Sequence, residues 1–94
     1  MKPDVSDVRY TAASPAKVEQ GLLGFTSFLI DGSIRVDSVQ VRLTRDGRRV
    51  LSFPSRRDHQ GHEHAYLAPI NDETRLTIET QVFDAIGLGE ERRP

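Results

Sequence analysis

The stretch "LLGFTSFLIDGSIRVDSVQVRLTRDGRRVLSF", residues 22–53, decides the fold of this chain. It contains three apolar, β-branched runs that are separated by the pairs Asp31-Gly32 and Asp46-Gly47. An Asp-Gly pair between two such runs is typical of a tight hairpin, because the turn positions need a positive φ. The stretch therefore predicts three consecutive antiparallel strands.

The remaining strands are predicted from shorter patterns. "VSDVRYT", from Val5, alternates and predicts a first strand, and "AYL", residues 65–67, is consistent with a short edge strand. The alternation of the run that begins at Ile34 shifts near Asp37-Ser38, which indicates either a β-bulge or two partly covered faces. Turn-forming residues predict loops at residues 14–21 and 55–64.

One helix is predicted, over residues 72–86 of "APINDETRLTIETQVFDAIGLG". Asn71 is a favourable N-cap, and Gly87 is a favourable residue just past the C-terminus. Ile70, before the cap, is expected to pack onto the first turns. The face expected to be buried contains Ile78, Val82, Phe83, Ala85 and Ile86. The acidic residues Asp72, Glu73 and Glu79 are interpreted as capping groups and a solvated face.

These elements predict an α+β fold, with an antiparallel β-sheet meander of four to five strands and one C-terminal α-helix packed on it. The 94 residues are expected to form a single domain, residues 1–94, with residues 90–94 as a flexible tail. One helix covers only part of such a sheet. We therefore expect the remaining apolar face or an open strand edge to be covered in a homodimer.

The charge is concentrated in one part of the chain. The formal net charge is -1, but residues 42–57 contain six arginines and one acidic residue, a local net charge of +5. The chain has no cysteine, no signal-peptide pattern at residues 1–10 and no apolar run of the ~20 residues that a membrane span needs. These features predict a cytoplasmic protein without disulfides that does not act in a membrane.

The arginine block predicts contact with phosphate groups. Guanidinium groups bind phosphate oxygens well, and the Ser55 hydroxyl is a further donor beside Arg56 and Arg57. If the second hairpin and the loop project to the same end of the sheet, their arginines converge. The alternative is that these arginines are solvated surface residues. Candidate stacking aromatics are few (Tyr10, Phe53 and Tyr66), so base stacking is not favoured.

The histidines His59, His62 and His64 crowd the loop after the arginines. Their spacing fits no helical or strand-based zinc site, so we interpret them as polar loop residues that extend the basic patch when protonated. A catalytic triad of Ser55, His59 and Asp58 is not favoured, because it would lie in one short loop without an oxyanion hole. No enzymatic activity, metal or other cofactor is therefore predicted.

The motifs "SDVR", "RVDSVQV", "FPSRR" and "APIN..TR..IE..V" resemble the stage V sporulation protein G (SpoVG) family of bacterial septation proteins. The resemblance runs from about Val5 to about Ile86. It implies a small α+β homodimer that binds DNA or RNA through the basic loop and the nearby helix. It also implies a regulatory role in cell division, sporulation or another developmental programme.

Two interpretations follow. In the first, the protein is a nucleic-acid-binding regulator whose binding is weak and salt-sensitive. Its candidate contact residues are Arg56, Arg57, Ser55, Arg45, Arg48, Arg49 and, from the resemblance, Arg75. In the second, the protein is an interaction module that contacts division, envelope or other regulatory proteins without binding nucleic acid directly.

Overall fold

The structure, a computed structural model, describes residues 2–87; the tail expected at residues 90–94 lies outside them. The elements follow in the order β1 (Val5–Ala12), α1 (Pro15–Glu19), β2 (Leu22–Ile30), β3 (Ile34–Leu43), β4 (Arg49–Ser52), β5 (Ser55–Arg57), β6 (Glu63–Ala65) and α2 (Asp72–Ile86). Strands β1 to β4 form one antiparallel sheet in that order, and β5 and β6 form a separate two-stranded sheet. The prediction of an α+β fold with a four-stranded antiparallel sheet and a C-terminal helix is confirmed.

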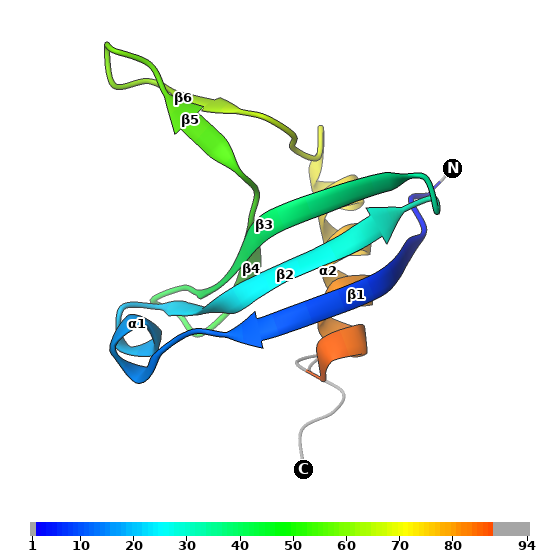
Figure 1. The fold of residues 1–94 in the computed structure, drawn as a ribbon, viewed down its shortest axis with the longest axis horizontal. Helices are drawn as coiled ribbons and strands as arrows, with labels where there is room; N and C mark the ends of the chain where they lie inside the picture. Colours follow the sequence, from blue (N-terminus) through cyan, green and yellow to red (C-terminus); the bar gives the residue numbers. More distant parts are fainter. Residues whose placement is uncertain (1, 88–94) are drawn as a thin grey trace.

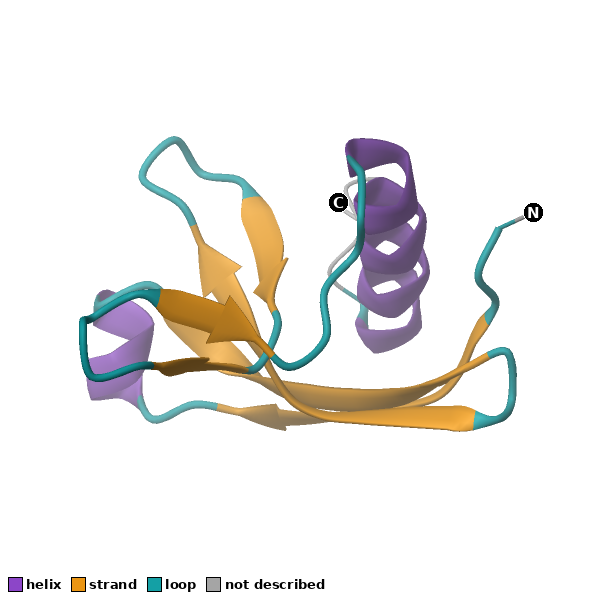
Figure 2. Ribbon diagram, turned by 90° about the horizontal axis from the view of Figure 1, so that it is seen from above, coloured by secondary structure: helices purple, strands orange, loops and turns teal. Residues whose placement is uncertain are grey.

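Helix α2 covers one face of the main sheet. It crosses behind the strands in Figure 1, and Figure 2 shows it on one side of the sheet. No other element of residues 2–87 covers the opposite face of the central strands (Figure 2). The molecule therefore has one packed layer between sheet and helix, and one open sheet face.

The two Asp-Gly pairs form hairpin turns of different kinds. Asp31 and Gly32 both have positive φ, 54° and 68°, as the predicted tight turn requires. In the second connection Gly47 has a φ of 87°, and its N–H donates to the Thr44 carbonyl at 3.0 Å. This connection spans residues 44–48 and is longer than the first connection, which spans residues 31–33.

The shift in alternation on β3 is a bulge. Ser38 has a φ of 62°. Thr26 pairs with Val39 and Phe28 pairs with Val36, so a step of two residues on β2 corresponds to a step of three residues on β3. The extra residue turns both Val36 and Val39 toward the core, where they are fully or almost fully buried. Of the two sequence interpretations at Asp37-Ser38, the bulge is confirmed.

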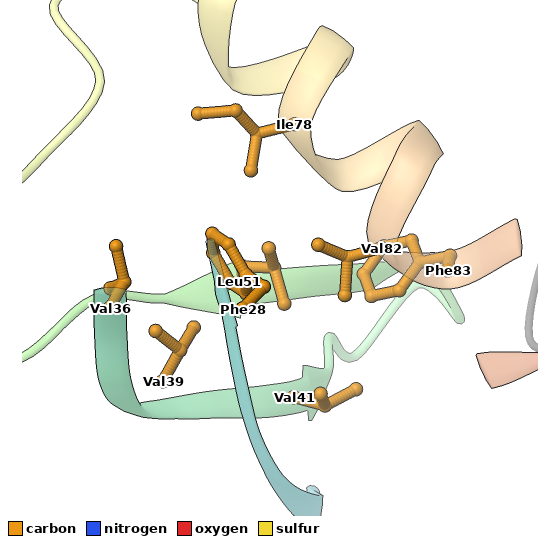
Figure 3. Packing of buried hydrophobic residues seen from close by; sticks show 8 residues of the cluster. All are labelled: Phe28, Val36, Val39, Val41, Leu51, Ile78, Val82 and Phe83. Atoms are coloured by element: carbon orange, nitrogen blue, oxygen red, sulfur yellow. The ribbon is translucent and has the colours of Figure 1, made fainter. Parts of the chain in front are cut away.

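The core lies between the main sheet and α2. Figure 3 shows Phe28 and Leu51 of the sheet packed against Ile78, Val82 and Phe83 of the helix. The helix caps are as predicted, since the Asn71 side chain accepts a hydrogen bond from the Thr74 N–H at 2.8 Å and Gly87 is left-handed. Three details of the prediction are wrong: Ala85 is exposed, Glu79 is buried, and Ile70 is 90% exposed rather than packed on the helix.

Two segments predicted as loops are ordered elements. Within residues 14–21, Pro15 begins the short helix α1, whose extended N-cap is Ser14. The polar segment after Pro54 is a β-hairpin, with Ser55 opposite Ala65 and Arg57 opposite Glu63. The expected edge strand at residues 65–67 is therefore wrong in position, since β6 is Glu63–Ala65 and pairs with β5 instead of the main sheet.

Candidate nucleic-acid interface

The β5–β6 hairpin forms an arm that extends away from the main sheet (Figure 1). We call residues 55–65 the arm. Arg56 and Arg57 lie on β5 and are exposed, as is Ser55 at the base of the strand. Arg56 lies directly opposite His64, which brings a permanent cation and a titratable imidazole to neighbouring positions.

The tip of the arm is organised by Asp58. Its Oδ1 accepts hydrogen bonds from the N–H groups of Gln60 and His62, both at 2.9 Å, and its Oδ2 lies 2.8 Å from Nε2 of His64. The hydrogen bond with His64, followed by that from the His62 N–H, holds the pKa of Asp58 below its usual range. Gly61 takes the positive φ, 85°, that the turn needs.

The two arm arginines differ in their surroundings. Arg57 Nη2 lies 3.7 Å from Oε2 of Glu63 on the opposite strand, in an exposed ion pair. Arg56 forms no ion pair with any carboxylate of residues 2–87. The arm contains two arginines and two acidic residues, so its net charge is zero when the histidines are neutral.

The β3–β4 turn forms a second basic group. Arg48 Nε lies 3.5 Å from Oδ2 of Asp46, whose carboxylate also accepts a hydrogen bond from Thr44 Oγ1. Arg45 is exposed and, within residues 2–87, forms no ion pair. Arg49 opens β4 and is half-buried. Residues 42–49 carry four arginines and one aspartate, so this turn is more basic than the arm.

The two basic groups do not converge within one chain. Figure 1 shows the arm rising at the upper left and the β3–β4 turn at the lower left, beside α1. In Figure 2 the β3–β4 turn rises on the helix side of the sheet, whereas the arm extends to the left. The structure therefore separates Arg56 and Arg57 from Arg45, Arg48 and Arg49.

Arg75 is held in a structural contact. Its Nη1 donates to the Leu51 carbonyl at 3.3 Å and lies 3.7 Å from Oε2 of Glu79. Glu79 Oε2 in turn accepts the Leu51 N–H at 3.0 Å. Arg75 thus lies at the edge of β4 and contacts its residue Leu51.

The histidines do not assemble a metal site. In the described part of the chain, no group of three or more histidine, aspartate or glutamate side chains is arranged to hold a metal ion. His62 Nδ1 lies 3.9 Å from Oδ2 of Asp58, beside the closer contact from His64. These two imidazoles share one carboxylate.

Sequence reasoning missed one candidate residue, Phe25. It lies on the central strand β2 between Thr11 and Gln40. Its neighbour Thr26 is buried, so the Phe25 ring points to the open face of the sheet, where the residue is 36% exposed. The alternation of residues 22–30 predicts that Phe25 and Phe28 lie on different faces of the strand. Which of the two faces is open becomes clear only from the position of α2, which covers one face of the sheet (Figure 2).

A hollow of about 440 Å³ lies beside Phe25 on this face. Its walls include Arg9, Thr11, Ser27, Asp37 and Ser38. The Arg9 guanidinium lies 3.4 Å from Asp7, and Asp7 also accepts a hydrogen bond from Arg35 at 2.6 Å. That bond, followed by the charge of Arg9, lowers the pKa of Asp7.

A scan against protein-family models and a search of curated proteins find no match to this chain. Within residues 2–87, neither helix has the length and apolar character that crossing a membrane requires.

Proposed function

We propose that this protein is a cytoplasmic, homodimeric regulator of the SpoVG type, which binds DNA or RNA and acts in septation or developmental control. Arg56 and Arg57 hold phosphates on the arm, with Ser55 beside them. Arg45, Arg48 and Arg49 hold phosphates at the β3–β4 turn. The binding is weak and salt-sensitive, since each of these arginines releases counterions from the nucleic acid when it binds a phosphate.

One observation carries the proposal: Arg56 is exposed on a projecting arm, next to Arg57, and has no carboxylate partner in residues 2–87. An arginine that folding does not use for an internal ion pair keeps its donors available to a phosphate. Arg75 has a different role in this proposal. It stabilises the contact between α2 and β4, and affects nucleic-acid binding only through the fold.

A homodimer doubles the number of arginines that one nucleic-acid molecule can contact. Support for a second copy comes from an apolar groove of about 330 Å³ at the start of α2, lined among others by Phe53, Leu67 and Ile70. Covering the Ile70 side chain, 90% exposed, removes apolar surface from water. Ile70→Lys is expected to shift the protein from dimer to monomer in analytical ultracentrifugation, and a dimer that persists in this variant places the interface elsewhere.

The test of nucleic-acid binding uses fluorescence anisotropy with labelled DNA and RNA at two salt concentrations. Arg56→Ala with Arg57→Ala is expected to weaken binding to all sequences alike and to lower the salt slope by roughly one unit for each phosphate that is no longer bound. Lys17→Ala removes one exposed charge outside the arm, the β3–β4 turn and the groove, and serves as the control when effects are compared per charge removed. Equal weakening in both variants would show that only net charge matters, and unchanged binding in the arginine variant would remove the arm from the site.

The same groove supports a second candidate function, that of a protein-interaction module in division or envelope regulation. An exposed apolar groove is typical of a docking site for a partner protein. A pull-down from nuclease-treated extract tests this function. Partners that stay bound after nuclease treatment, but do not bind the Ile70→Lys variant, favour it.

A further inference from the structure

The open face of the main sheet carries a single exposed aromatic ring in polar surroundings. Phe25 is flanked by Thr11 on β1 and Gln40 on β3, and Ser27 lies two residues further along the same strand and face. The hollow beside Phe25 has a mostly polar lining. It suits a ligand that covers one ring and makes hydrogen bonds around it.

The groups around Phe25 match the chemistry of a nucleotide base. Hydroxyl groups of threonine and serine bond either donors or acceptors on a base edge, and a carboxylate accepts from an exocyclic amino group. Asp37, at the hollow, has no ion pair within residues 2–87 and is available as such an acceptor. A negative charge there disfavours a phosphate in the hollow itself.

A cation, Arg9, lies at the hollow beside Phe25. The side chain of Arg9 is 70% exposed at the hollow, and its ion pair with Asp7, at 3.4 Å, is longer than that of Arg35 with Asp7, at 2.6 Å. Asp7 is therefore held mainly by Arg35, and the exposed guanidinium of Arg9 can bind a phosphate at the rim.

We infer that Phe25 is a stacking platform for an unpaired base, and that the open face of β1, β2 and β3 binds single-stranded nucleic acid. This inference rests on the proposed nucleic-acid binding and names its ligand class. Bases in a duplex are stacked on one another and do not present a face to a ring on a flat sheet, whereas every unpaired base does. Single strands therefore bind more tightly than duplexes of the same sequence.

The experiment measures the affinity of the full chain for a labelled ten-nucleotide RNA, the same sequence as DNA, and the corresponding duplexes. Phe25→Leu keeps an apolar side chain on the strand but removes the aromatic face, and is expected to weaken single-strand binding by roughly tenfold. Phe25→Trp keeps a ring and is expected to retain the affinity. Ile34→Ala, at another exposed apolar position of the sheet, should bind as the unmodified chain does.

Thermal unfolding of each variant separates a defect in binding from a defect in folding. Weaker binding by Phe25→Leu together with retained affinity in Phe25→Trp supports the inference. Equal affinity of Phe25→Leu and the unmodified chain, or tighter binding of duplexes, overturns it and leaves the arm arginines as the site. Absence of binding to every oligonucleotide overturns the inference and the proposed function together.

Discussion

The carboxylate of Glu79 accepts a hydrogen bond from the backbone N–H of Leu51 at 3.0 Å, and so joins α2 to the edge strand β4. Arg75, one turn earlier on the helix, donates to the Leu51 carbonyl at 3.3 Å. Both backbone groups of Leu51 are therefore bound by helix side chains. This position of the edge cannot pair with a strand of another chain, which protects β4 from edge-to-edge association.

Replacing Glu79 is expected to destabilise the fold. Glu79 is 7% exposed, and Glu79→Ala leaves the Leu51 N–H without its acceptor and removes the ion-pair partner of Arg75. A buried hydrogen bond to a charged group contributes about 1.5–3 kcal/mol, so we expect the free energy of unfolding to fall by about 2–3 kcal/mol. Urea unfolding followed by circular dichroism measures the change.

Two variants serve as controls for Glu79. Glu79→Gln keeps an acceptor for the Leu51 N–H and should lose less stability than Glu79→Ala. Glu73→Gln removes an exposed carboxylate from the same helix and should change stability by no more than about 1 kcal/mol. If all three variants unfold at the same urea concentration, the Glu79 contact does not stabilise the fold.

Gly24 is expected to be intolerant of any side chain. A Cβ at this position would lie 2.5 Å from the Thr11 carbonyl oxygen and 2.6 Å from the Tyr10 ring. The oxygen belongs to the paired backbone of β1, so Gly24→Ala must shift the strand and is expected to lower stability by about 1–3 kcal/mol. Thermal unfolding measures the decrease, with Ser27→Ala on the same strand as control.

A double variant separates the two contacts of Gly24. Tyr10→Ala removes the ring but leaves the Thr11 carbonyl in place. If the backbone contact dominates, Gly24→Ala destabilises the Tyr10→Ala protein as much as it destabilises the unmodified one. If Gly24→Ala does not lower the stability of the Tyr10→Ala protein, the contact with the Tyr10 ring is the cause instead.

Local backbone chemistry made part of the fold predictable from sequence. Asp31 and Gly32 tolerate positive φ, and Asn71 caps a helix by its own side chain, so these features need no knowledge of distant residues. Glu79 shows the opposite case. A glutamate on a helix is normally solvated, and its burial depends on the Leu51 N–H, 28 residues away.

The candidate site was less predictable, because its arrangement also depends on residues that are distant in sequence. The arm and the β3–β4 turn are adjacent in sequence, but β4 lies between them and separates their arginines in space. Phe25 is one of several apolar residues in its run. Its availability to a ligand follows from α2 covering only the other face (Figure 2).

The bulge at Ser38 is expected to discriminate between substitutions. Ser38 has a φ of 62°, a left-handed conformation in which a β-branched side chain is strained. Ser38→Val is expected to lower stability by about 1–3 kcal/mol, whereas Ser38→Gly, which adopts this φ without strain, should fold with little change. Chemical unfolding of the two variants tests this. A Ser38→Val protein as stable as the Ser38→Gly protein would mean that the bulge is not maintained.

The arm is expected to lose its order in acid before the main sheet does. The folded arm holds the pKa of Asp58 below its usual range, mainly through His64. The stabilisation is therefore fully present above the ordinary aspartate pKa and is lost as the pH falls below about 4 and through the lowered value. Amide exchange of Gln60 and His62, whose N–H groups donate to Asp58, should accelerate relative to the sheet over this range.

Asp58→Ala should show the loosened arm already at neutral pH, while Asp58→Asn, which keeps an oxygen acceptor, should retain the turn without the acid transition. Arm and sheet amides that respond to pH along one common curve would show that Asp58 does not control the arm locally.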